Sequence, residues 1–500
     1  REPDHDLDGC GSAVWRQLES HDAERSGMKR RSFLALTAGG AAAASAGLLG
    51  QHWLSRAGQV SPVMSQPVVR SSQGALTLDL VAQETRITIP GTAGRALTYN
   101  GLLPGPVLEF NAGDDVKIQL HNRLNQPTNL HYHGLHVSPE GNADNVFLSV
   151  QPGASQSYSF QIPDDHPAGL FYYHPHHHGT VSDQVFGGLG GALIVRGELD
   201  RIPEVQSAQE EVLFLKDLPA DRQPGMGGAM LGREGSVLTV NGQVNPTIET
   251  PAGGLLRLRL VNGSNARFWR LALEGHRLHL IATDGGALEQ PLAIEDLLLV
   301  PGARADVLVQ ISPTGGQFRL RNRSYNRVGR RMMGMRRMVA SSQGEETIAT
   351  IQTHGTTTPV ALPRELLPIQ PLNNPVRTRR FVMNHGMAPG MGMMFLINGQ
   401  PYDHQRIDTR VRLADIEDWD LVNTGVMDHP FHVHVNPMQV ISRNGEPERL
   451  LAWRDVVLVR AGETVRVRTQ FRDFSGRSVY HCHILDHEDL GMMGNLLIEA

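Results

Sequence analysis

The sequence predicts an all-β protein made of three related β-sandwich domains. Glycine and proline are frequent, with 53 and 30 of the 500 residues, which is typical of chains rich in turns. Short runs that alternate apolar and polar residues recur along most of the chain, and clusters of Gly, Pro, Asn and Asp separate them. Hydrophobic residues make up 40% of the chain and charged residues 19%, so we expect a packed core rather than general disorder.

The N-terminal region predicts an export signal. Met28 is a plausible start, which makes residues 1–27 a non-native upstream extension. Within residues 28–50, Arg30 and Arg31 precede a short apolar stretch that ends at an Ala-x-Ala cleavage motif. The adjacent arginines resemble a twin-arginine export signal. A membrane anchor is the alternative, although the stretch is short and rich in glycine and alanine for a bilayer span.

Three stretches of the remaining chain have the same pattern of strands and turns. The first covers residues 70–197, the second residues 205–345 and the third residues 378–500. A glycine turn before an alternating strand recurs in each of them, at Gly113, Gly302 and Gly462. Residues 340–377 are rich in Thr, Pro and Gln and are predicted to link the second and third domains.

The charge and the cysteine content exclude several classes of protein. The formal net charge is −5, so there is no global basic field that would attract nucleic acid or an anionic membrane. Cys10 and Cys482 are the two cysteines of the sequence, which excludes a disulfide framework. We therefore expect no nucleic-acid partner and no stable membrane insertion. We also expect the protein to be a monomer.

Histidine is the unusual component, with 23 residues, many of them in four short clusters. Residues i and i+2 of a strand point to the same face, about 6.6 Å apart, so a His-x-His pair can bind one metal ion or two neighbouring ions. A single pair is often only a surface strand, but four pairs near the two ends of the chain indicate a metal site. The clusters are His131-Tyr132-His133, His174-Pro175-His176, His429-Pro430-Phe431-His432-Val433-His434 and His481-Cys482-His483.

Cys482 indicates which metal is bound. It lies between His481 and His483, so in a strand its side chain points to the opposite face from theirs. The two histidines can therefore serve one metal centre while the thiolate serves another. A thiolate with two imidazoles and a weak methionine ligand forms a blue-copper site, whereas a zinc site would not need this division of faces. The candidates for the other three ligands are His429, His487 and Met492.

With these motifs the sequence resembles the multicopper oxidases, the family of laccases, cuprous oxidases and ferroxidases. The resemblance covers residues 70–500 and implies three cupredoxin-like Greek-key β-sandwiches that hold four coppers per chain. The type 1 copper would bind His429, Cys482, His487 and, axially, Met492. The type 2 copper would bind His131 and His432. The type 3 pair would bind His133, His174, His176, His434, His481 and His483, with a pairing through His178 as the alternative.

The resemblance also implies the reaction. Single electrons from a substrate would enter at the type 1 copper and pass through Cys482 to its histidine neighbours, and dioxygen would be reduced to water. This reduction consumes protons, which a carboxylate near the cluster must supply. Asp144 and Glu488 stand at positions that resemble the acidic relay residues of the family, and a solvated turn residue is the alternative for each. An axial methionine implies a low to medium redox potential.

Methionines suggest the substrate, because thioethers select Cu(I). One group contains Met332, Met333, Met335 and Met338, but nearby arginines would repel a cation there. The second group supplies more plausible ligands for a substrate copper, namely Met387, Met391, Met393 and Met394. Met427 matches the position of a substrate-copper methionine in cuprous-oxidising relatives, and Asp428 could add a carboxylate. We predict oxidation of cuprous or other metal ions in periplasmic copper homeostasis, with a general laccase acting on phenols and aromatic amines as the alternative.

Three other classes fit the sequence less well. Copper nitrite reductases have two domains per chain and lack the full set of trinuclear histidines. A noncatalytic relative with the same fold acts in cell division, but it has lost copper ligands that this sequence retains. A copper-storage protein would not need the bridge formed by Cys482. The expected partners are therefore dioxygen and a small reducing substrate.

Overall fold

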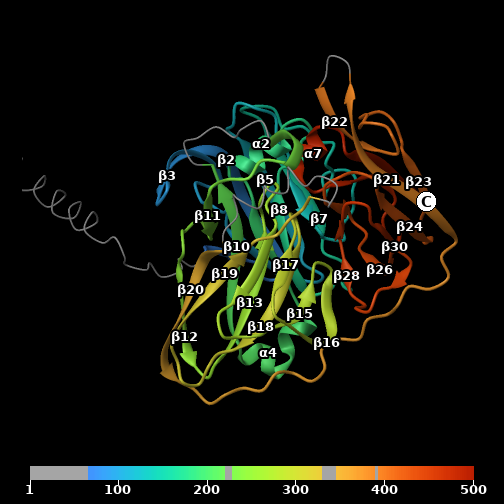
Figure 1. The fold of residues 1–500 in the computed structure, drawn as a ribbon. Coiled ribbons are helices and arrows are strands. Elements are labelled where there is room, and N and C mark those ends of the chain that lie inside the picture. The colour runs from blue at the N-terminus through green and yellow to red at the C-terminus, as the bar shows by residue number, and fades with distance from the viewer. Residues whose placement is uncertain (1–65, 220–227, 329–344, 389–391) are drawn as a thin grey trace, which may run out of the picture. The chain divides into compact units, whose positions relative to one another are not determined.

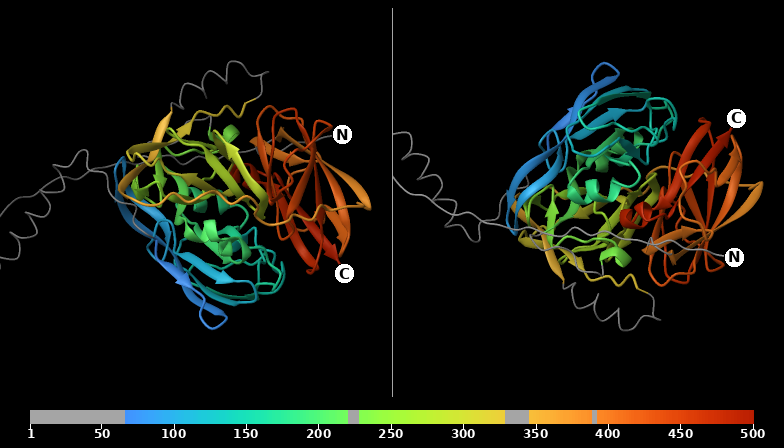
Figure 2. Two further views of the ribbon diagram at one scale, coloured as in Figure 1. Left: turned by 90° about the horizontal axis from the view of Figure 1, so that it is seen from below. Right: turned by 90° about the horizontal axis from the view of Figure 1, so that it is seen from above.

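The computed structural model describes residues 66–219, 228–328, 345–388 and 392–500. The predicted export signal, Cys10, the first methionine group and Met391 lie outside these residues. The structure confirms the predicted all-β fold, because the described chain forms six sheets and five short helices. Figures 1 and 2 show the sheets in three pairs, coloured blue to green, green to light orange and orange to red along the chain. No helix among the described residues is long and apolar enough to cross a membrane.

The first pair of sheets covers the first predicted domain, and its first strand begins two residues earlier than predicted. One sheet has the strand order β3(Thr92–Tyr99), β2(Ala75–Ile89), β5(Asp115–Asn122), β7(Ser155–Gln161). The other has the order β1(Val68–Arg70), β4(Val107–Asn111), β9(Gly191–Arg196), β8(Gly169–His174), β6(His131–His133). Apolar residues of both sheets form one buried cluster, so the sheets pack face to face. The alternation of apolar and polar residues explains this packing, since the buried apolar residues of β5 are Val116, Ile118 and Leu120.

The second pair of sheets reaches further along the chain than predicted. One sheet has the order β11(Val237–Val240), β10(Gln209–Leu218), β13(Leu255–Asn262), β18(Arg304–Gln310), β15(Leu278–Thr283), β16(Gly286–Ile294). The other has the order β12(Thr247–Ala252), β20(Glu346–Thr356), β19(Gln317–Arg323), β14(Trp269–Leu273), β17(Leu297–Leu299). The prediction that residues 340–377 are a linker was therefore wrong for β20. Its threonines favour a strand, and Ile348 and Ile351 are buried in the core.

The third pair of sheets carries the C-terminal histidine clusters. One sheet has the order β22(Gly392–Ile397), β21(Arg377–Ala388), β24(Ile416–Asn423), β30(Thr464–Gln470), β26(Met438–Arg443), β27(Glu446–Pro447), and β28(Trp453–Arg454) also pairs with β26. The other has the order β23(Thr409–Arg412), β32(Met493–Glu499), β31(Gly476–Cys482), β25(His429–Val433), β29(Val456–Val459). The helices are α2(Val181–Gly187), α3(Glu198–Arg201), α4(Pro203–Ser207), α5(Gly228–Leu231) and α7(Leu485–Asp489), and α2 lies against α7 (Figure 1).

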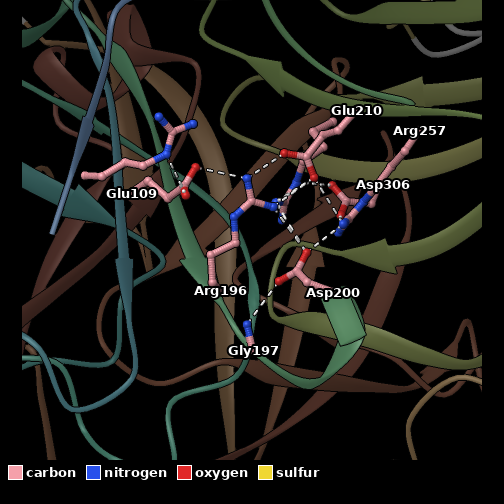
Figure 3. Close-up of polar contacts among 9 residues, drawn as sticks. Glu109, Arg196, Gly197, Asp200, Glu210, Arg257 and Asp306 are labelled. Carbon is pink, nitrogen blue, oxygen red and sulfur yellow. Dashed lines mark hydrogen bonds and ion pairs between the residues drawn. The ribbon is translucent and has the colours of Figure 1, made fainter. Parts of the chain in front are cut away.

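A partly buried network of charges joins the first two pairs of sheets (Figure 3). Arg196 of β9 bonds both Glu109 of β4 at 2.9 Å and Glu210 of β10 at 2.7 Å. Arg257 of β13 is almost fully buried and bonds Asp200 at 2.6 Å. Breaking a buried pair leaves an uncompensated charge, so this network fixes how the first and second sandwiches meet.

Candidate metal centre

Four strand ends bring the predicted histidines together between the first and third sandwiches. His131 and His133 occupy β6, which pairs with β8 so that His131 lies opposite His174. In the third sandwich β25 pairs with β31, and His432 lies opposite His481. Eight histidines that are distant in sequence therefore converge and are all buried, namely His131, His133, His174, His176, His432, His434, His481 and His483.

The eight imidazoles form small groups with metal-binding geometry. In one group His176, His434 and His481 converge, and the Nε2 atom of His481 is 3.1 Å from the Nε2 atoms of both others. A second group contains His133, His174 and His483, with 3.5 Å between His133 Nδ1 and His174 Nε2. The two remaining histidines, His131 and His432, form a third group together with His133, which is thus shared between two groups. His178 is half-buried and lies 3.8 Å from Asp489, so the structure places His176 rather than His178 in the cluster.

Hydrogen bonds on the outer side of the rings orient the histidines. His131 Nδ1 is 2.8 Å from an Asp144 oxygen, and His432 Nδ1 donates to the Asp455 carbonyl at 2.8 Å. The inward Nε2 atoms of these two histidines are buried and have no hydrogen-bond partner in the described part of the chain. An outer N–H fixed by a carboxylate or carbonyl, with the other nitrogen left free, is the arrangement of a metal-ligating histidine. The residues present therefore fit bound metal ions.

Burial keeps these imidazoles in the form that binds metal. Desolvation lowers the pKa of each of the eight histidines and of His429 and His487, and neighbouring imidazoles lower several of them further. For His174 and His429 the pKa falls to about 3. At neutral pH the rings are uncharged, and neutral imidazole is the ligand form.

We expect the metal-free protein to lose stability steeply as the pH falls below about 6.5, the ordinary pKa of histidine. The folded protein keeps ten imidazoles neutral, whereas the unfolded chain protonates them in this range. Each such histidine lowers the free energy of unfolding by about 1.4 kcal/mol per pH unit. Asp144 and Glu488 have raised pKa values, so they increase the free energy of unfolding as the pH falls. Two carboxyl groups do not offset ten histidines. Thermal unfolding of metal-free protein at pH values from 7 to 5 tests this, and a constant or rising Tm would contradict it.

Cys482 lies in a separate group with His429 and His487. Its Sγ atom is 3.5 Å from His429 Nδ1 and 3.7 Å from His487 Nδ1, and these two nitrogens are 3.3 Å apart. Met492 is also fully buried, and its backbone bonds both Cys482 and His487. Burial raises the pKa of the Cys482 thiol well above its usual range, so a bound cation is needed to hold the thiolate form at neutral pH. Cys482 is in a different group from His481 and His483, as the alternation of side chains predicts, and the two histidines themselves belong to two separate groups.

The two predicted carboxylates both lie beside the histidine cluster. Asp144 accepts a hydrogen bond from the Tyr132 backbone at 2.9 Å in addition to its contact with His131, and burial raises its pKa to about 8. Glu488 lies 3.2 Å from His481 Nδ1 and 3.7 Å from His176 Nε2, and burial raises its pKa well above the usual range. Neither residue is the solvated turn acid considered as an alternative, because both are buried.

Sequence reasoning missed two residues that support the cluster, Arg304 and Asp455. Arg304 lies in β18 of the second sandwich, is fully buried and forms two 2.6 Å hydrogen bonds with the Asp455 carboxylate. Asp455 in turn lies 3.0 Å from His133 Nε2. Gly134 has a φ of +87°, and a side chain there would collide with both residues of this ion pair. The available signal was the charged pair Arg454-Asp455 directly before an apolar strand.

The predicted substrate ligands fall into two sets. Met427 and Asp428 are buried, and the Asp428 carboxylate accepts hydrogen bonds from Tyr325 at 2.7 Å and from the Ala461 backbone at 2.9 Å. The structure therefore does not place these two residues where a cation from solvent would reach them. Met387 is 76% exposed, and Met393 and Met394 are half-buried.

Comparison with known proteins agrees with this geometry. Three sequence profiles, each described as multicopper oxidase, match residues 81–200, 212–344 and 371–500. The chain belongs to the multicopper oxidase family. A multicopper oxidase from Campylobacter jejuni, described as a metallo-oxidase, has a TM-score of 0.78 and 33% identity to this multicopper oxidase, covering 89% of this chain and 96% of that one.

Two curated relatives of this multicopper oxidase have different names. The multicopper oxidase mco of Staphylococcus haemolyticus is 29% identical over 418 residues, covering 80% of this chain and 83% of that protein. The cell division protein FtsP of Dickeya dadantii is 30% identical over 466 residues, covering 89% of this chain and 93% of that protein. Membership of the family implies copper, and the histidine groups of this chain are suited to it.

Proposed function

We propose that this multicopper oxidase oxidises a small reducing substrate by single electrons and reduces dioxygen to water. One copper would be held by His429, Cys482 and His487, and Met492 would supply a weaker thioether ligand. Three further coppers would be held by the eight converging histidines, with His131 and His432 at the type 2 ion and the other six at the type 3 pair. Bound copper would supply the redox chemistry, and the chain supplies the ligands, their orientation and the protons.

The observation that carries this proposal is the position of Cys482. Cys482 is the direct sequence neighbour of His481 and His483. A single peptide bond on each side therefore connects the group that contains the Cys482 thiolate to the buried histidine groups. A site built only to store copper does not need this connection. Asp144 and Glu488 are buried beside those groups and have raised pKa values, so they can hold a proton at neutral pH and deliver it to the reacting oxygen.

We further propose that the substrate is Cu(I) and that the enzyme acts in periplasmic copper homeostasis after twin-arginine export. Four cuprous ions and four protons would be consumed per dioxygen, producing four cupric ions and two waters. Exposed and half-buried methionines on the β21–β22 hairpin support this choice, since thioethers favour Cu(I). A general laccase that oxidises phenols and aromatic amines is the second candidate.

A noncatalytic role, suggested by the relatives named for cell division, is the third candidate. The ten predicted histidine ligands and Cys482 lie in groups that could hold metal ions, which favours catalysis over a purely structural role.

Dioxygen uptake by copper-loaded protein tests these candidates. A stabilised Cu(I) complex is compared with dimethoxyphenol, with and without excess Cu(II). We expect fast uptake with Cu(I) and phenol turnover only when Cu(II) is added. Brisk phenol turnover without added Cu(II) would favour the laccase, and no uptake with either donor in a fully copper-loaded protein would favour the noncatalytic role.

A further inference from the structure

The short helix α7 carries two residues that the proposed function needs. Its five residues include His487 of the proposed type 1 site and Glu488 beside the histidine cluster. A helix this short is not stable alone in water, and among the described residues no side chain caps its N-terminal end. Contacts with the rest of the protein must therefore hold α7 and set where His487 and Glu488 lie.

Within the described part of the chain, Asp486 of α7 accepts four hydrogen bonds from other segments. Its Oδ1 atom accepts from Ser182 Oγ at 2.6 Å and from Arg233 Nε at 2.7 Å. Its Oδ2 atom accepts from the Arg233 backbone at 2.6 Å and from Asn265 Nδ2 at 2.6 Å. Ser182 belongs to α2 of the first sandwich, whereas Arg233 and Asn265 belong to the second. One side chain of the third sandwich is thus bonded to both of the other sandwiches.

This junction is tightly packed and almost closed to solvent. Asp486 is 8% exposed, and Ser182 and Asn265 are buried. Gly232 has a φ of +78°, and a Cβ atom there would lie 2.6 Å from Ile484 Cγ2 and 3.5 Å from Asp486 Oδ2. A side chain at this glycine would therefore collide with the start of α7, so the second sandwich lies directly against the helix.

The stretch of the second sandwich that bonds Asp486 also orients His487. It begins in α5, where the Met230 carbonyl accepts a hydrogen bond from His487 Nε2 at 3.1 Å. The other ring nitrogen, Nδ1, lies 3.7 Å from Cys482 Sγ and 3.3 Å from His429 Nδ1. An outer partner of this kind fixes the tautomer and the ring orientation of a ligating histidine. A change that frees this stretch from Asp486 would therefore also disturb the partner of His487.

The other end of α7 is bonded to the first sandwich. Asp489 accepts hydrogen bonds from the backbone N–H groups of Gly179 at 2.6 Å and Ser182 at 2.9 Å, beside α2 (Figure 1). His487 and Glu488 thus lie between two acids that are each bonded to another sandwich. The position of the helix depends on how the three sandwiches meet.

We propose that Asp486 is a positioning residue, which ties α7 to the second sandwich and so holds His487 in the orientation that binds copper. The second sandwich supplies none of the proposed copper ligands, and this tie gives it a role at the type 1 site. A carboxylate is required, because all four groups that face Asp486 are donors. An amide in its place would turn its NH₂ group toward two of them. This inference rests on the proposed oxidase function, which includes the type 1 copper.

The variant Asp486→Asn tests this role, and Asp183→Asn is its matched control. Asp183 bonds the same Arg233 guanidinium at 2.7 Å but is largely exposed. In Asp486→Asn the affinity of the type 1 site for copper, measured by competition with a chelator, should fall about 10–100-fold. The paramagnetic resonance splitting of the type 1 ion should change, while the type 2 signal stays. The control should match the unchanged protein. An unchanged type 1 affinity and spectrum in folded Asp486→Asn would overturn the proposal, because a merely structural residue would lower the Tm alone.

The milder variant Asn265→Ala decides the question if Asp486→Asn does not fold. It removes one of the four donors and leaves the carboxylate in place, so the same changes should appear in the same direction with smaller size. Equal type 1 affinity and spectrum in Asn265→Ala and the unchanged protein would then overturn the proposal.

Hydrogen exchange of the metal-free protein separates a failure of this tie from a failure of the oxidase. The backbone amides of α7 should exchange at least about tenfold faster in Asp486→Asn or Asn265→Ala than in Asp183→Asn, because a hydrogen bond to a charged group is lost. Equal exchange in all of these proteins would overturn the proposal. If the unchanged protein develops no blue band on loading with copper, the proposed oxidase function fails, whereas the exchange rates still decide whether Asp486 holds α7.

Discussion

The variant Cys482→Ser is expected to lose the blue absorption band and to lower dioxygen uptake to the level of the copper-free protein. In the proposed function the thiolate links the proposed type 1 ligands to the neighbouring histidines, and a serine hydroxyl is a poor copper ligand. The fold should survive, because Ile484 already donates a hydrogen bond to the Cys482 sulfur and can donate to a hydroxyl instead. Absorption measures the blue band, dioxygen uptake measures the activity, and copper content measures how much copper the variant still binds.

Met492→Leu is the matched control for this variant. It changes a buried neighbour of the same site but keeps the thiolate and both histidines, so the blue band should remain and the redox potential should rise. Oxidase activity retained by Cys482→Ser, with Cu(I) or with a phenol, would contradict the assignment of the type 1 site.

The variant Arg304→Met is expected to weaken copper binding by the histidine cluster while the blue band stays. Arg304 is the buried cation that holds Asp455, and Asp455 orients His133 and His432. Loss of such outer partners lowers metal affinity by about 10–100-fold. Leaving Asp455 buried without its cation also destabilises the fold by about 3–5 kcal/mol. Copper content, electron paramagnetic resonance of the type 2 ion and thermal unfolding measure these effects.

Arg257→Met is a control that separates the two expected effects of Arg304→Met, which are weaker copper binding and lower stability. Arg257 is equally buried in the second sandwich and pairs with Asp200 and Asp306, away from the histidines. It should destabilise the protein without lowering the copper content of folded molecules. The double variant Arg304→Met/Asp455→Asn removes the unpaired charge, so it should recover stability but not the type 2 signal. Normal copper content and an unchanged type 2 spectrum in Arg304→Met would contradict this role.

Local pattern was enough to predict the fold class and which histidines lie near each other. Alternation within strands placed Cys482 opposite to His481 and His483, and the structure separates them in that way. The histidine motifs are short and lie on single strands, so their geometry is set locally. The same reasoning was wrong for β20, because threonine is common both in linkers and in strands, and only pairing with β12 and β19 decides between them.

Contacts between sandwiches could not be predicted in this way. Arg304 and Asp455 are 151 residues apart in sequence and meet only when the second and third sandwiches pack together. His385 has no histidine neighbour in sequence, and its place near His429 depends on the register of β21 with β22. Burial of Asp428 likewise depends on Tyr325, which comes from another sandwich. In each case the deciding contact is long-range.

The most direct test of the central claim is the electron balance of dioxygen reduction. Copper-loaded protein is given a measured amount of a one-electron donor in air-saturated buffer, and dioxygen consumed and hydrogen peroxide released are both counted. Coupling of the Cys482 site to the histidine cluster predicts four donor electrons per dioxygen and no peroxide. Two electrons per dioxygen with matching peroxide release would contradict it, because the buried histidine groups would then not act together as one oxygen-reducing site.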